Sequence, residues 1–116
     1  MREQILALLK GMPVAAAFIY GSVAHGTAIP NSDIDVFVVL EHDLPGEQIS
    51  ELRSRFHDVQ RCLGYMPDPQ FPVEIFTVAA IGDALAAVEP DEDQQEIRRA
   101  LMDKKIMLTG SVEFLP

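Results

Sequence analysis

The chain has 116 residues, 48% of them apolar, which suffices for one hydrophobic core but not for a catalytic domain with a separate substrate domain. Its 18 acidic and 9 basic residues give a formal net charge of −9, which disfavours a partner as strongly anionic as a nucleic acid. The single cysteine, the lack of a signal-peptide pattern and the lack of an apolar run of membrane-spanning length predict one cytoplasmic domain over residues 1–116.

The first half of the chain alternates between helical and strand patterns. Residues 2–10 have the apolar spacing of a short amphipathic helix, which Gly11 and Pro13 end. Residues 14–20 form an apolar run of strand length that stops at Gly21, and we expect a short helix and a turn after it. A second strand is predicted for residues 33–40.

The second half continues in the same way. Pro45 opens a helix whose apolar residues recur every three or four positions up to Gly64, and Cys62 is expected to be buried on its apolar face. The other predicted elements are a strand over residues 73–78, helices over residues 81–88 and 91–103, and a short strand over residues 106–109. The sum is an α/β or α+β domain in which helices flank a small mixed sheet.

Two aspartates, one residue apart, open the second predicted strand. Alternate side chains of a strand share a face, so Asp33 and Asp35 should point the same way, with Cα atoms about 6.6 Å apart. Two like charges this close repel each other unless a cation neutralises them, and Mg²⁺ or Mn²⁺ with oxygen ligands is the natural candidate. Glu74, in the third predicted strand, either completes a site of three carboxylates or faces solvent on an edge strand.

The turn after the first strand offers a place for phosphate. Gly21 lets the backbone approach a ligand closely, and the free N–H groups of a turn that leads into a helix attract anions. The Ser22 hydroxyl adds a donor. A carboxylate metal site beside a phosphate-binding turn predicts a nucleoside triphosphate as ligand.

These motifs resemble the signature of a known superfamily. The residues that carry the resemblance are Gly21-Ser22, Gly26, Ser32-Asp33-Ile34-Asp35 and Glu74. They look like the DNA polymerase β-like nucleotidyltransferases, particularly their minimal nucleotidyltransferase (MNT) branch. The resemblance covers residues 14–78 well and implies a nucleotidyltransferase fold.

The resemblance also implies roles for individual residues. Asp33 and Asp35 would bridge two Mg²⁺ or Mn²⁺ ions, and Glu74 would ligate the ion nearer the acceptor. The nucleotide, most plausibly ATP, would be contacted by Gly21, Ser22 and Ser32. The implied partner is a small helical HEPN-domain protein, onto a hydroxyl of which the chain would transfer AMP.

Two classes of function stay open at this stage. The first is an Mg²⁺-dependent enzyme that transfers a nucleoside monophosphate, and the second is a non-catalytic antitoxin or accessory subunit that docks on a HEPN-like partner. The three clustered acids favour the enzyme, because docking alone does not need them. His25 is either a phosphate donor, in place of the arginine that similar proteins often carry, or a surface residue of the short helix.

Overall fold

The computed structural model describes residues 2–26, 34–67 and 72–110. Along the chain the elements are α1 (Arg2–Leu9), β1 (Val14–Tyr20), α2 (Gly21–His25), β2 (Asp35–Leu40), α3 (Gly46–Cys62), β3 (Glu74–Thr77), α4 (Val78–Ala86), α5 (Glu92–Met102) and β4 (Ile106–Gly110). No helix in the described part of the chain is long and apolar enough to cross a membrane.

The four strands form one mixed sheet in the order β3-β2-β1-β4. β1 is antiparallel to both β2 and β4, whereas β2 and β3 are parallel, with Phe37 opposite Glu74. The expectation of a single small mixed sheet is therefore confirmed. The register also brings the end of β1 beside the start of β2, because Tyr20 lies opposite Asp35.

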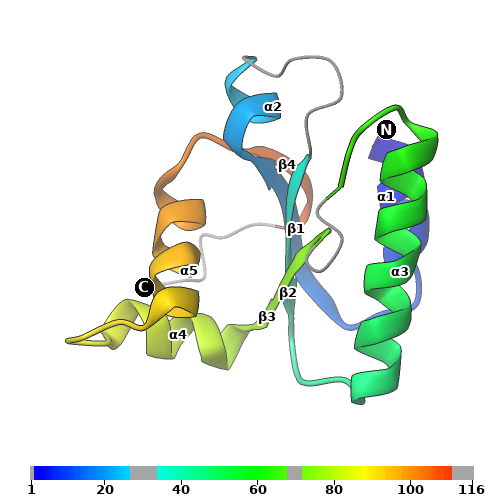
Figure 1. Cartoon of the computed structure of the whole chain (residues 1–116). Helices are drawn as coiled ribbons and strands as arrows, with labels where there is room; N and C mark the ends of the chain where they lie inside the picture. Colours follow the sequence, from blue (N-terminus) through cyan, green and yellow to red (C-terminus); the bar gives the residue numbers. More distant parts are fainter. Residues whose placement is uncertain (1, 27–33, 68–71, 111–116) are drawn as a thin grey trace.

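Helices cover both faces of the sheet, as Figure 1 shows. α1 and α3 pack on the face to which β2 contributes Val36, Val38 and Leu40. α4 and α5 pack on the opposite face, where Phe37 stacks between Phe18 and Phe76 with ring centroids 5.0 and 5.5 Å apart. The alternation of side chains along a strand explains this division, and α2 is left at one end of the sheet (Figure 1).

Several boundaries differ from those predicted. The third strand is shorter than residues 73–78 because α4 starts at Val78 rather than at residue 81: the Thr77 hydroxyl accepts the Ala80 N–H at 3.1 Å and caps the helix. α5 keeps close to its predicted range, with Asp91 as N-cap and Asp103 as C-cap. Cys62 is exposed at the end of α3, so the prediction of a buried cysteine is wrong.

Candidate functional site

Asp35 stands at the first position of β2, at the end of the sheet where β1 finishes. Alternation places it on the same face as Phe37, which is the face covered by α4 and α5. Its cross-strand neighbour Tyr20 is 6% exposed and donates its hydroxyl to Glu96 Oε1 of α5 at 2.9 Å. Asp35 therefore lies at the end of the sheet, beside a residue that α5 contacts.

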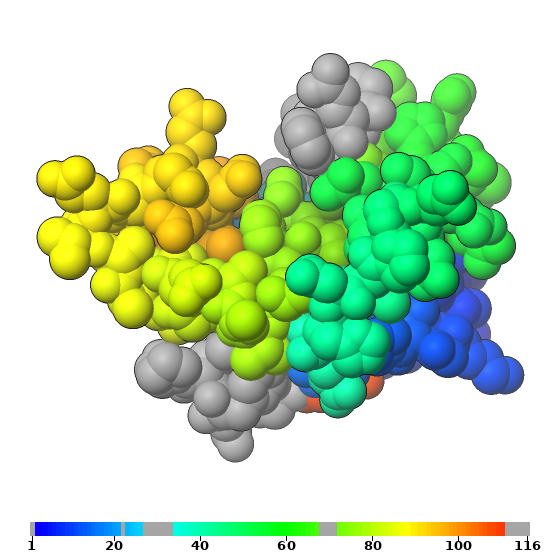
Figure 2. Space-filling view, turned by 90° about the horizontal axis from the view of Figure 1, so that it is seen from below, coloured from blue at the N-terminus to red at the C-terminus, as the bar shows by residue number. Residues whose placement is uncertain are grey.

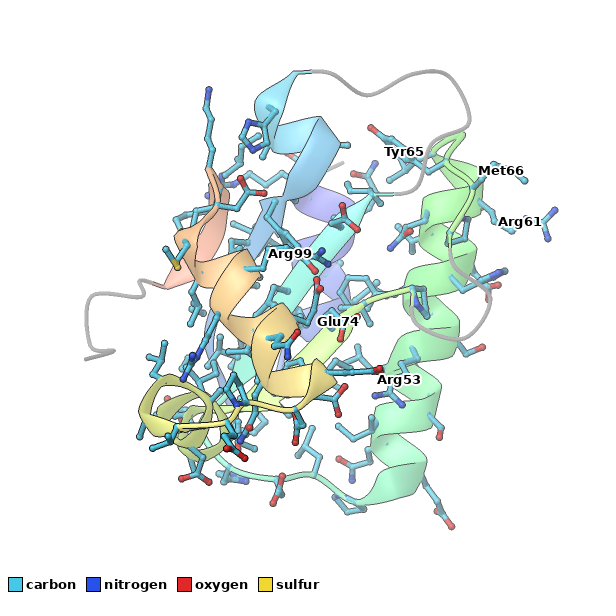
Figure 3. All side chains as sticks on the ribbon, turned by 60° about the vertical axis from the view of Figure 1, so that its left-hand side comes forward. Arg53, Arg61, Tyr65, Met66, Glu74 and Arg99 are labelled. Atoms are coloured by element: carbon cyan, nitrogen blue, oxygen red, sulfur yellow. The ribbon has the colours of Figure 1, made fainter. Side chains whose placement is uncertain are left out.

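Glu74 is the first residue of β3 and belongs to the same face. Its register partner Phe37 is two residues beyond Asp35. The two acids therefore lie diagonally across adjacent strands, two residues out of register and on the same face. Figure 3 shows Glu74 between Arg99 of α5 and Arg53 of α3. Glu74 is partly buried. Figure 2 shows the molecule from the end of the sheet opposite α2, where residues of β3 and α4 reach the surface between α3 and α5.

The surroundings of Glu74 make its charged form costly. Burial raises the pKa of the Glu74 carboxyl, and the negative charges of Glu96, Asp93 and Asp35 raise it further, while the Arg53 guanidinium opposes them. These three acids outnumber the one opposing arginine, so the potential around Glu74 is negative. Such a potential attracts a divalent cation.

Asp33, Ser32 and the side chain of Ser22 lie outside the described residues. Among the residues that are described, no three His, Cys, Asp or Glu side chains are arranged as a ready metal site. Asp35 and Glu74 nevertheless supply the oxygen donors that a hard ion requires, on one face and on neighbouring strands. The predicted partner for them is Asp33, one residue before the described Ile34.

The carboxylate of Asp35 leaves no room for a side chain at position 21, so this residue must be glycine. Its φ is +70°, and a Cβ atom built on it would lie 2.1 Å from Oδ2 of Asp35. A side chain at this position would therefore both strain the backbone and displace the carboxylate. The glycine of the predicted phosphate-binding turn is thus needed to let the turn approach the acidic site.

The same glycine is held from the other side by the end of α5. The Gly21 N–H donates to Oδ2 of Asp103 at 3.3 Å, and Nε2 of His25 contacts Oδ1 of the same carboxylate. The hydrogen bond with His25 lowers the pKa of Asp103, to which the N–H groups of Lys104 and Gly21 also contribute. In this structure His25 therefore faces Asp103.

Sequence reasoning missed Glu96, Arg53 and Asp103. Arg53 carried a usable signal, because it interrupts the edge of the apolar stripe of α3 between Leu52 and Phe56. Glu96 and Asp103 carried none, since they belong to helix α5 and its C-cap, in which acids are ordinary. Only the packing of α5 over the sheet brings them to Tyr20 and Gly21.

Comparison with known proteins identifies one matching family. The family model described as "Polymerase beta, Nucleotidyltransferase" matches residues 3–81, which is more than half of the chain and includes every predicted site residue. No curated protein matches the sequence significantly.

Solved structures share the fold at low sequence identity. A toxin–antitoxin crystal structure with AMP-PNP has a TM-score of 0.58 and 19% identity, and the alignment covers 95% of this chain and 73% of that one. A mutant of the MntA–HpeT toxin–antitoxin pair gives 0.58 and 17%, covering 96% and 74%. A tri-AMPylated HEPN toxin of Shewanella oneidensis in complex with its MNT antitoxin gives 0.51 and 15%, covering 95% and 70%.

Proposed function

Because the chain belongs to the polymerase β nucleotidyltransferase family, we propose that it transfers AMP from ATP to a hydroxyl group of a HEPN-like partner protein. The observation that carries the proposal is the pair Asp35 and Glu74, on one face of adjacent strands, with Gly21 packed against the Asp35 carboxylate. The similar solved structures include a toxin–antitoxin pair with AMP-PNP and a tri-AMPylated HEPN toxin with its MNT antitoxin, and they support this choice of nucleotide and partner.

Asp33, Asp35 and Glu74 are the residues that would hold two Mg²⁺ or Mn²⁺ ions. When bound, such ions lower the pKa of the acceptor hydroxyl and neutralise charge on the α-phosphate and the leaving pyrophosphate. The carboxylates suit this task because their oxygen atoms are the ligands that a hard divalent ion prefers, and both Asp35 and Glu74 are only partly buried.

The reaction needs a base and an anchor for the triphosphate. Glu74 would also accept the proton of the acceptor hydroxyl. The oxygen of the acceptor then forms a bond to the α-phosphorus while the bond from the α-phosphorus to the bridging oxygen breaks and pyrophosphate leaves. The backbone of Gly21 and Ser22, and the side chains of Ser22 and Ser32, would hold the phosphates.

Nucleotide binding is tested first by thermal denaturation. A ligand that binds only the folded state raises the melting temperature, by an amount equivalent to about 2.7 kcal/mol at a concentration ~100 times its Kd. We expect Mg²⁺ with AMP-PNP to stabilise the native protein and not the Asp35→Asn variant. Asp83→Asn, on an exposed position of α4, removes the same charge and should keep the effect. Equal stabilisation of native and Asp35→Asn proteins would place the ligand elsewhere.

Transfer is tested with a HEPN-like protein encoded next to the gene. Mass spectrometry of that protein after incubation with ATP and Mg²⁺ should show added AMP with the native chain and none with Asp33→Asn. Parallel reactions with CTP, GTP and UTP measure the base preference. Labelling of free RNA or a small alcohol with the partner untouched would overturn the choice of acceptor. Tight association without any transfer would instead identify a docking protein.

A further inference from the structure

Asp103 joins three parts of the chain that are far apart in sequence. Its backbone N–H bonds to the Arg99 carbonyl at the end of α5, whereas its carboxylate reaches Gly21 and His25, at either end of α2. The contact with Gly21 spans 82 residues of sequence. An anionic group thus sits on the backbone N–H of the Gly-Ser turn.

We propose that Asp103 is an internal competitor of the nucleotide, whose carboxylate occupies the Gly21 N–H in the unliganded protein and must leave when a phosphate group takes that donor. This inference rests on the proposed function, because it assumes that the triphosphate binds at the Gly-Ser turn. It adds a residue that sets nucleotide affinity without touching the reacting atoms.

The geometry allows the side chain to leave without moving the backbone. Lys105 Nζ donates to the carbonyls of Leu101 at 2.8 Å and Asp103 at 3.0 Å, so the junction between α5 and β4 is held independently of the carboxylate. The bond from Gly21 is long at 3.3 Å, and the Asp103 side chain is 26% exposed. Rotation about its side-chain bonds would carry the carboxylate toward solvent, at the cost of its contacts with His25 and with the Lys104 N–H.

Because Asp103 is negatively charged, it weakens the binding of a phosphate group at the Gly21 N–H. The Asp103 carboxylate and the phosphate oxygens are both anions, so each weakens the binding of the other at a shared N–H donor. A unit charge about 4 Å from another changes affinity by about fivefold even in bulk water, and more beside several phosphate charges. A neutral side chain of the same shape can bond to Gly21 without this repulsion.

The experiment compares nucleotide affinity in three proteins at low salt. Isothermal titration with AMP-PNP and Mg²⁺ is carried out on the native chain, on Asp103→Asn and on Asp83→Asn, which removes an equal charge from an exposed position of α4. We expect Asp103→Asn to bind about fivefold more tightly than Asp83→Asn, with the advantage shrinking as salt is added. Inorganic tripolyphosphate, as a second probe, should show the same ratio because the competition involves phosphate alone.

Two further variants keep the test decisive if Asp103→Asn melts early. Asp103→Ser keeps a short hydrogen-bond acceptor without charge and should also bind more tightly, whereas Asp103→Glu keeps the charge and should not. If the native chain binds AMP-PNP and neither neutral variant binds it more tightly, the inference is overturned and the proposed function stands. Absence of binding in all the proteins, Asp83→Asn included, would overturn both.

Discussion

At the residue scale, the site depends on a glycine that separates two carboxylates. Gly21 has the Asp35 carboxylate against its Cα and accepts no side chain there, while its N–H reaches Asp103. The positive φ alone would favour glycine, but the contact with Asp35 links this backbone position directly to the acidic site. Gly26 provides the comparison, because its φ is +73° and none of the described residues comes within 4 Å of a Cβ built on it.

Substitution of these two glycines separates strain from displacement. Gly21→Ala and Gly26→Ala should each cost about 1–2 kcal/mol of unfolding free energy, because an alanine at positive φ is strained. Only Gly21→Ala should also abolish the stabilisation by AMP-PNP and Mg²⁺, since it pushes the Asp35 carboxylate aside. Chemical denaturation and thermal melts measure both effects. Retention of ligand stabilisation in Gly21→Ala would show that Asp35 does not need its present position.

Glu74 predicts a pH dependence of stability in the metal-free protein. Its pKa in the folded chain is raised above the ordinary value of 4.5, so in the window above 4.5 the native state binds more protons than the unfolded state. Stability contributed by this group is therefore lost as pH rises through that window. Glu74→Gln should melt at a higher temperature than the native protein at neutral pH and at the same temperature well below pH 4.5.

A control for net charge is available in Glu89, which is exposed beyond α4. Glu89→Gln removes one charge outside the acidic cluster and measures the effect of charge number alone. The melting temperatures of both variants are measured across the pH range in the presence of a chelator. A gap between Glu74→Gln and Glu89→Gln that does not grow with pH would contradict the assigned environment of Glu74.

At the element scale, long-range hydrogen bonds tie helices α3 and α1 to the two edges of the sheet. Gln60 of α3 is fully buried, and its Nε2 donates to the Pro72 carbonyl at 2.6 Å, two residues before β3. On the other edge, the Arg2 guanidinium of α1 donates to the carbonyls of Met107 and Leu108 in β4 at 3.0 and 2.9 Å. Each helix of this layer thus anchors one edge of the sheet.

Loss of the Gln60 amide should loosen the start of β3. Gln60→Leu leaves the buried Pro72 carbonyl without this donor, which should cost about 1–3 kcal/mol of unfolding free energy. Gln48→Leu, on an exposed position of the same helix, should change stability by no more than about 0.5 kcal/mol. Urea denaturation of both variants checks the difference. An equal cost in the two would mean that the buried bond contributes nothing specific.

At the scale of the whole molecule, the excess of acids opposes compaction. The formal net charge of −9 creates self-repulsion that dissolved salt screens. Raising NaCl from about 0.01 M to about 0.1 M shortens the screening length from about 30 Å to about 10 Å. The melting temperature should then rise in the presence of a chelator, where no divalent ion contributes. KCl should act equally, and a fall in melting temperature with either salt would contradict this account.

The sequence alone determined the elements and the main motifs, because their signals are local. Apolar periodicity located the helices and strands to within a few residues, and a mixed sheet followed from their order. Glycine at the end of β1 and an acid at the head of β2 are also readable locally, since backbone freedom and strand alternation are properties of neighbouring residues.

Only the tertiary structure decided which distant groups meet. The helix start at Val78 depended on the Thr77 cap, and the exposure of Cys62 depended on where α3 leaves the core. Glu96 reaches Tyr20 across 76 residues and Asp103 reaches Gly21 across 82, because α5 packs over the end of the sheet at which β1 finishes. Such contacts arise from the packing of whole elements. No local sequence pattern therefore indicates that an acidic residue of a helix will face the site.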